Sequence, residues 1–191
     1  MLPEPIAVTV KVTETLEELA IPYLIGGSLA STLYGMVRTT QDADIVADMR
    51  LEHIQPFANS LQNEFFIDEE MISKSIRRYS SFNIIHRATM FKVDVFIPRP
   101  RPFHQSQLAR AQRYIFSTDP EVSARFSSAE DTILSKLEWY RLGGEVSERQ
   151  WRDVLGVLKT GAEALDRDYL RKWAKELKVS DLLEKVLEDS T

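Results

Sequence analysis

The chain of 191 residues contains no cysteine and three histidines. Without cysteine, disulfides and thiolate metal sites are excluded, and cysteine usage says nothing about the redox compartment. The histidines, His53, His86 and His104, are scattered along the chain, which argues against a zinc cluster. We therefore expect no sulfur-based chemistry, and we interpret His86 and His104 as surface or turn residues.

Long apolar runs are also absent. No run approaches the ~20 residues that a membrane-spanning helix requires, and Met1 to Pro5 lacks the basic and apolar regions of a signal peptide. The glycine motifs of P-loop, dinucleotide-binding and serine-hydrolase proteins are missing as well. These absences predict a cytoplasmic protein with no membrane partner, and they leave three common enzyme classes without support.

Acidic residues outnumber basic ones, giving a net charge of -5, but the basic residues are unevenly distributed. Between Met71 and Tyr114 the single acid is Asp94, and the basic residues are Lys74, Arg77, Arg78, Arg87, Lys92, Arg99, Arg101, Arg110 and Arg113. This stretch, the basic segment 74–113, suits a polyphosphate or an RNA backbone. A solvated surface balanced by acids from elsewhere explains it equally well.

The first part of the chain has the pattern of a helix followed by a strand, a tight turn and a second helix. Apolar residues recur at helical spacing over residues 5–20. Tyr23–Ile25 is a short apolar run that leads into Gly26 and Gly27. Ser28 is then a natural N-cap for the helix that follows.

The patterns that come next indicate a mixed sheet. Acid and apolar residues alternate from Gln41 to Met49, as in a half-buried strand, and residues 54–61 have helical spacing. Ser81–Ile85 and Phe91–Ile97 are β-type runs that predict a hairpin with a short loop. The sheet is therefore expected to be at least partly antiparallel.

Proline and then helical signals characterise the remainder of the sequence. Three prolines within residues 98–102 predict an exposed extended loop, and a short strand is expected near residues 114–117. Capping-box patterns at Ser127 and Ser147 each predict the start of a helix, and two more amphipathic helices follow. The change of character near Phe126 predicts a domain of residues 1–126 and a helical C-terminal part of residues 127–191.

Three acids form the main candidate for chemistry. Asp42 and Asp44 are two residues apart on a predicted strand, so both carboxylates project from one face, and Asp94 lies in an otherwise apolar run. Carboxylates grouped in this way repel one another unless solvent separates them or a divalent cation neutralises them. Phosphoryl-transfer enzymes use such carboxylates to hold two Mg²⁺ ions about 4 Å apart. A glycine turn nearby lets the backbone approach a phosphate.

Each of these features has an ordinary structural alternative. Asp42 and Asp44 fit exposed acids on an edge strand, and the glycine pair fits a simple turn. Asp94 fits an ion pair with Arg87 or with Lys92.

The ordered set Ile25-Gly26-Gly27-Ser28, Asp42-Ala43-Asp44-Ile45 and Val93-Asp94-Val95 resembles the signature of the DNA-polymerase-β-type nucleotidyltransferase superfamily. The resemblance covers roughly the first half of the chain. It implies that the first two acids bind two Mg²⁺ ions and that the third helps to activate the attacking hydroxyl. It also implies that Gly26, Gly27 and Ser28 seat a nucleoside triphosphate (NTP).

The C-terminal part resembles the nucleotidyltransferase-like toxins of the AbiEii type. The matching residues are Glu130, Asp131, Lys136, Arg149, Arg152 and Asp153. This resemblance implies that Lys136 and Asp153 belong to the nucleotide site, whereas ordinary exposed positions on amphipathic helices are the alternative. Arg38 is a further candidate, either for phosphate or for an ion pair with Asp48.

The sequence thus predicts an α+β nucleotidyltransferase fold, with a mixed sheet flanked by helices and a helical C-terminal part. The expected activity is Mg²⁺-dependent transfer of a nucleoside monophosphate from an NTP to an acceptor hydroxyl. An RNA or transfer-RNA end is the first acceptor we expect, through the basic segment, followed by a protein and then by a small molecule. Such an enzyme fits the toxin of a toxin–antitoxin pair, with a cognate antitoxin as partner. The alternative is a non-catalytic module that binds a nucleotide or a partner protein, such as an antitoxin.

Overall fold

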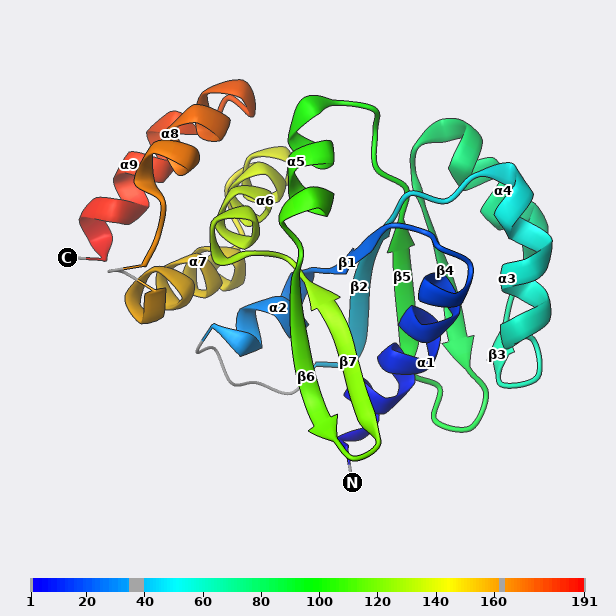
Figure 1. Cartoon of the computed structure of the whole chain (residues 1–191). Helices are drawn as coiled ribbons and strands as arrows, with labels where there is room; N and C mark the ends of the chain where they lie inside the picture. The colour runs from blue at the N-terminus through cyan, green and yellow to red at the C-terminus, as the bar shows by residue number, and fades with distance from the viewer. Residues whose placement is uncertain (1, 35–39, 162–163, 191) are drawn as a thin grey trace. The chain divides into compact units, whose positions relative to one another are not determined.

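The computed structural model describes residues 2–34, 40–161 and 164–190 (Figure 1). The chain forms two compact units. The first consists of Met1–Gly26 and Thr39–Phe126, and the second of Gly27–Arg38 and Ser127–Thr191. One division falls after Phe126, and the described residues 27–34 group with the C-terminal helices rather than with the sheet.

A seven-stranded mixed sheet organises the first unit, in the order β3-β4-β5-β2-β1-β7-β6. Two neighbouring pairs, β2 with β5 and β1 with β7, are parallel, and the other neighbours are antiparallel. The strands are β1 (Tyr23–Ile25), β2 (Asp42–Ala47), β3 (Phe65–Phe66), β4 (Ser81–His86), β5 (Lys92–Phe96), β6 (Gln112–Thr118) and β7 (Glu121–Phe126). The predicted hairpin of β4 and β5 and the partly antiparallel sheet are confirmed.

One face of the central strands is packed into the core. Burial alternates along β2 and β5, with Ala43, Ile45, Val93 and Val95 fully buried. The helices of this unit are α1 (Glu4–Glu18), α3 (Ile54–Leu61), α4 (Glu69–Arg78) and α5 (Pro102–Arg110), with a 3-10 turn η1 (Leu51–His53) before α3. Because α1 contacts β2, β7 and α3, it covers the buried face of the sheet, as Figure 1 shows in blue.

The expectation of an extended loop over residues 98–102 is wrong at its end. Pro102 begins α5 instead of continuing the loop. Proline is tolerated there because the first N–H groups of a helix have no partner within the helix. Helix α4 and strand β7 were not predicted, whereas the strand near residues 114–117 is confirmed within β6.

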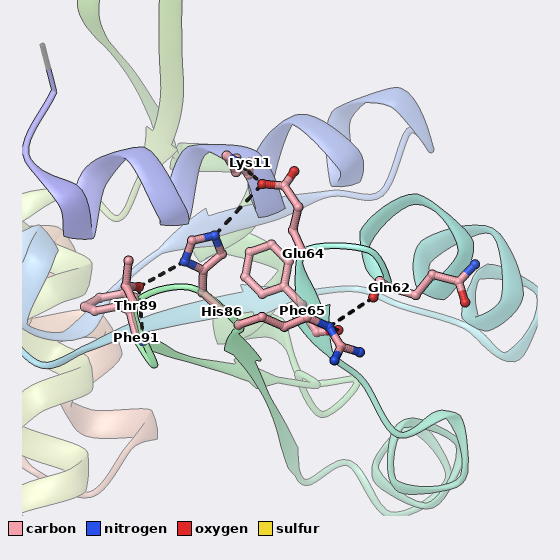
Figure 2. Close-up of polar contacts among 8 residues, drawn as sticks. Lys11, Gln62, Glu64, Phe65, His86, Thr89 and Phe91 are labelled. Atoms are coloured by element: carbon pink, nitrogen blue, oxygen red, sulfur yellow. Dashed lines mark hydrogen bonds and ion pairs between the residues drawn. The ribbon is translucent and has the colours of Figure 1, made fainter.

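His86 is the last residue of β4 and is buried beside the β4–β5 turn, so of the two expected positions, surface or turn, the surface position is wrong. Its Nδ1 lies 2.9 Å from the Thr89 hydroxyl in the β4–β5 turn, and its Nε2 lies 3.9 Å from Glu64 (Figure 2). Lys11 of α1 also contacts the Glu64 carboxylate. These contacts fasten the hairpin turn and α1 to the segment before β3, so His86 has a structural environment.

The second unit is helical. Its helices are α2 (Gly27–Leu33), α6 (Ala129–Leu142), α7 (Glu148–Gly161), α8 (Arg167–Glu176) and α9 (Ser180–Asp189). Helix α6 packs against α2, α7 and α8. Across the residues that the structure describes, no helix is both long and apolar enough to span a membrane.

The start of α6 differs by one residue from the predicted capping box. Ser128, not Ser127, is the N-cap, and its hydroxyl oxygen accepts a hydrogen bond from the Asp131 N–H at 3.1 Å. The Ser128 hydroxyl also donates to the Asp131 carboxylate at 2.9 Å. At α7 the predicted cap is confirmed, since the Gln150 N–H donates to the Ser147 hydroxyl oxygen at 3.3 Å.

Candidate active site

The three candidate acids share one face of the sheet. Asp42 and Asp44 are half-buried on β2, on the face opposite to the core residues. Asp44 lies directly opposite Asp94 in the register of the parallel strands β2 and β5. Neighbouring strands are about 4.8 Å apart, so the two side chains leave the sheet side by side. Because β2 lies between β5 and β1, the alternative of an exposed edge strand is wrong.

A lysine stands among these carboxylates. The Lys92 ammonium lies 2.6 Å from the Asp94 carboxylate, and Lys92 faces Asp42 in the β2–β5 register. The hydrogen bond to Asp94 raises the pKa of Lys92 against a smaller lowering by burial, and the charges of Asp94, Asp42 and Asp44 also raise it. Of the two partners considered for Asp94, the structure therefore selects Lys92.

Arg87, the other partner considered, points elsewhere. Its Nε donates to the main-chain carbonyls of Gln62 and Phe65, at 3.3 and 3.2 Å. Arg87 thereby helps to hold the segment that enters β3.

The carboxylate oxygens of Asp42, Asp44 and Asp94 suit a divalent cation, although these side chains are not arranged around one metal position. Carboxylate oxygens are the ligands that Mg²⁺ prefers, and the Lys92 ammonium already occupies a cation position against Asp94. Within residues 2–34, 40–161 and 164–190, no three His, Asp or Glu side chains are arranged so that they could hold a metal ion as they stand. Binding a metal through all three acids thus requires a change of side-chain positions.

The glycine turn is tied to the strand that carries the acids. The Gly26 N–H donates to the main-chain carbonyl of Asp44 at 2.9 Å. Gly27 has φ +55°, in the left-handed region where residues with a β-carbon are disfavoured. Helix α2 begins at Gly27, so Ser28 lies in its first turn and is not the N-cap that the sequence suggested.

In the second unit, the remaining candidate residues form a buried polar cluster. The Lys136 ammonium on α6 lies 2.8 Å from the Asp153 carboxylate on α7, with side chains only 11% and 4% exposed. One helical turn before Asp153, the Arg149 guanidinium donates to the Ser28 hydroxyl oxygen at 3.3 Å. The alternative that Lys136 and Asp153 are ordinary exposed residues is therefore wrong. Arg149 was noted in the helical motif but not counted among the nucleotide ligands.

The acids of the same motif, Glu130 and Asp131, are buried and engaged in structural contacts. The Tyr169 hydroxyl donates to the Asp131 carboxylate at 2.7 Å, and the Asp166 N–H donates to Glu130 at 3.0 Å. Both contacts join the start of α6 to the start of α8. Burial, followed by the charges of Glu130 and Asp131, raises the pKa of Tyr34 to about 12.

Two further predictions receive less support. Arg38 lies outside the described residues. The basic segment 74–113 spreads from α4 to β6, and strands β5 and β6 are separated in the sheet by β2, β1 and β7. Lys74 and Arg113 are neutralised by Glu70 and Glu121. The segment is thus dispersed over the first unit and partly neutralised.

A cavity of about 530 Å³ opens at the carboxyl ends of β2 and β5. Polar and charged side chains contribute much of its lining, among them Asp48, Arg50, Tyr79, Arg99 and His104. Asp42, Asp44 and Asp94 do not line it, so this cavity is separate from the face of the sheet that carries the three acids.

Comparison with known proteins identifies the fold. No protein-family model and no curated protein is similar enough in sequence to match the chain. A solved antigenic nucleotidyltransferase-like protein from Paracoccidioides brasiliensis is similar, with a TM-score of 0.60, 16% identity and 95% of this chain and 88% of that chain covered. ANT(2")-Ia in complex with adenylyl-2"-tobramycin has a TM-score of 0.50, 11% identity and 91% and 96% coverage. A presumed nucleotidyltransferase from Thermotoga maritima has a TM-score of 0.50, 18% identity and 80% and 95% coverage. The chain therefore has the mixed α/β fold of nucleotidyltransferase-like proteins.

Proposed function

We propose that this chain is a Mg²⁺-dependent nucleotidyltransferase that transfers a nucleoside monophosphate from an NTP to an acceptor hydroxyl. The observation that carries the proposal is the register of β2 and β5, which sets Asp94 beside Asp44 on the face that also bears Asp42. Acids grouped on rigid neighbouring strands are the arrangement that phosphoryl transfer needs. The similar fold of solved nucleotidyltransferase-like proteins supports the same class of reaction.

In the reaction, the acceptor oxygen forms a bond to the α-phosphorus while the bond from that phosphorus to the bridging oxygen breaks, releasing pyrophosphate. Asp42, Asp44 and Asp94 are the residues that would hold Mg²⁺, which when bound offsets negative charge on the reacting phosphates. We assign to the Asp94 carboxylate the further role of accepting the proton of the acceptor hydroxyl. Since Lys92 holds Asp94 at 2.6 Å, this role requires that ion pair to open.

For the NTP we propose contacts from Gly26, Gly27 and Ser28, with Arg38, Lys136 and Asp153 carried over from the family resemblance. The positive φ of Gly27 supports a turn that favours a residue without a β-carbon, which lets the backbone approach a phosphate. Lys136 is neutralised by Asp153 in the structure, so contact with a phosphate requires Lys136 to leave that partner.

Three acceptor classes fit this chemistry. We rank an RNA or transfer-RNA end first, a protein hydroxyl second and a small molecule third, and the first fits the toxin of a toxin–antitoxin pair. The solved complex of ANT(2")-Ia with adenylyl-2"-tobramycin supports the small-molecule class of acceptor. Strong salt dependence of acceptor binding would favour RNA, because neutralising phosphates releases counterions.

A labelling assay tests the proposal. The protein is incubated with Mg²⁺, each of the four α-labelled NTPs and total cellular RNA, beside an Asp42→Ala/Asp44→Ala variant. Label on RNA or on protein that requires the two acids would establish the activity, the base and the acceptor class. If no lane is labelled, the assay is repeated with aminoglycosides, and a second negative result would refute transfer to these acceptors.

The rival function is a non-catalytic module that binds a nucleotide or a partner protein, such as an antitoxin. The observation in its favour is the Lys92–Asp94 ion pair, which already neutralises one of the three acids. Partner or nucleotide binding that persists at full strength in the Asp42→Ala/Asp44→Ala variant, without any label transfer, would select this function.

A further inference from the structure

Lys92 lies on the acid face, which is the face of the sheet that carries Asp42, Asp44 and Asp94. It is two residues before Asp94 on β5, so both side chains project from the same side of the sheet. It also lies opposite Asp42 in register, and its ammonium is 2.6 Å from Asp94. The ammonium is thus paired with one of the three carboxylates that we propose as metal ligands, and its residue lies beside a second one in register.

The charges explain why an ammonium belongs there. Three carboxylates on adjacent strands repel one another. The side chains of Lys92 and Asp94 are 41% and 19% exposed, so water screens the charges of this pair incompletely. A bound cation removes this repulsion. In the metal-free protein, Lys92 supplies that positive charge from within the chain.

We propose that Lys92 is a positioning residue: it holds Asp94 as a built-in counter-cation and releases it when a divalent metal binds the acids. This inference rests on the proposed function, because it assumes that the acids are metal ligands. The consequence is a competition between the ammonium and the metal for the same carboxylate. Lys92 therefore reduces the repulsion among the three acids when no metal is bound, and it lowers the affinity of these acids for a metal ion.

Metal binding can be measured directly, without any assay of transfer. Mn²⁺, which electron paramagnetic resonance detects, is titrated into the wild-type chain and into Lys92→Met, Lys92→Arg, Lys74→Met and Asp44→Asn. Lys92→Met should bind Mn²⁺ about tenfold more tightly, because a partly buried competing ion pair is gone. Lys92→Arg keeps the positive charge and should bind like the wild type. Lys74→Met removes a lysine whose partner, Glu70, lies away from the acids on α4, and should also bind like the wild type.

Thermal unfolding provides the second measurement. Lys92→Met should melt at a lower temperature than the wild type in a chelator, because Asp94 loses the Lys92 ammonium, and Mn²⁺ should raise its melting temperature more than that of the wild type. This pattern also shows that the variant is folded.

The outcomes separate the two proposals. Tighter Mn²⁺ binding by Lys92→Met, or binding by that variant alone, supports the role of Lys92. Binding by the wild type that Asp44→Asn abolishes and Lys92→Met leaves equal or weaker overturns the role of Lys92 and keeps the metal site. No binding by either the wild type or Lys92→Met overturns both.

Discussion

Asp44 and Asp94 are direct neighbours across two parallel strands, although they are far apart in the sequence. Parallel pairing holds their Cα atoms about 4.8 Å apart, and alternation along the strands directs both carboxylates to the same side. The pair is therefore positioned by main-chain hydrogen bonds rather than by flexible loops. Such rigidity favours a site that must hold charged groups close together.

The first prediction concerns the Asp44 carboxylate. Asp44→Asn should reduce nucleotidyl transfer at least about a hundredfold, because an amide does not neutralise a metal ion. Its melting temperature should stay equal to that of the wild type or rise, since one repulsive charge is lost. Asp48→Asn changes a half-buried acid a few residues later in the chain and should leave transfer unchanged. Full activity of Asp44→Asn, measured with labelled NTP, would refute the assignment.

A second prediction addresses the buried ion pair of the helical unit. Lys136→Met takes the Lys136 ammonium away from the buried Asp153 carboxylate and should lower the free energy of unfolding by about 3–5 kcal/mol. Lys136→Met/Asp153→Leu removes both charges and should recover most of that loss. The exposed pair of Arg152 with Glu148 is the control, and Arg152→Met should change the free energy by less than about 0.5 kcal/mol. Urea unfolding measures all four proteins, and equal losses in the single and double Lys136 variants would contradict this account.

The third prediction uses the two adjacent glycines. Gly27→Ala should cost about 1–2 kcal/mol of stability, because an L-residue at φ +55° is strained. Gly26→Ala should cost less, because among the described residues its new β-carbon would meet the Leu24 side chain at an ordinary contact distance of 3.8 Å. Thermal unfolding compares the two variants. An equal or larger loss for Gly26→Ala would show that the left-handed conformation is not what requires glycine here.

Alkaline pH provides the fourth prediction. In the unfolded chain Tyr34 loses its proton near pH 10, but in the folded chain its pKa is about 12. The folded state therefore binds more protons between these values, so this contribution to stability is complete below about pH 10 and is lost as the pH rises through about 12. Tyr34→Phe should lose less stability than the wild type over this interval in urea unfolding. Identical curves for Tyr34→Phe and the wild type would contradict the prediction.

Local patterns in the sequence were enough to predict most of the elements near the candidate site. The alternation of acid and apolar residues determined that Asp42 and Asp44 share one face of β2, because successive side chains of a strand point to opposite sides. The apolar run before Gly26 determined a short buried strand and a turn. Both signals depend only on neighbours in the sequence.

Other local signals were ambiguous. Pro102 is compatible with a loop and with a first helical turn, and Ser127 and Ser128 are both able to cap a helix. Whether Pro102 begins a helix, and which serine caps α6, depends on the contacts that the neighbouring residues make in the folded protein. Ser128 is selected because its hydroxyl reaches the N–H and the carboxylate of Asp131.

Only the tertiary structure decided which residues meet across the chain. The register that sets Asp94 beside Asp44, the choice of Lys92 over Arg87 as its partner, and the burial of Lys136 against Asp153 all join distant segments. No spacing within one segment encodes such contacts, because they follow from strand pairing and helix packing. The sequence by itself determined which residues carry the charge, and the pairing of β2 with β5 determined that the charges share one site.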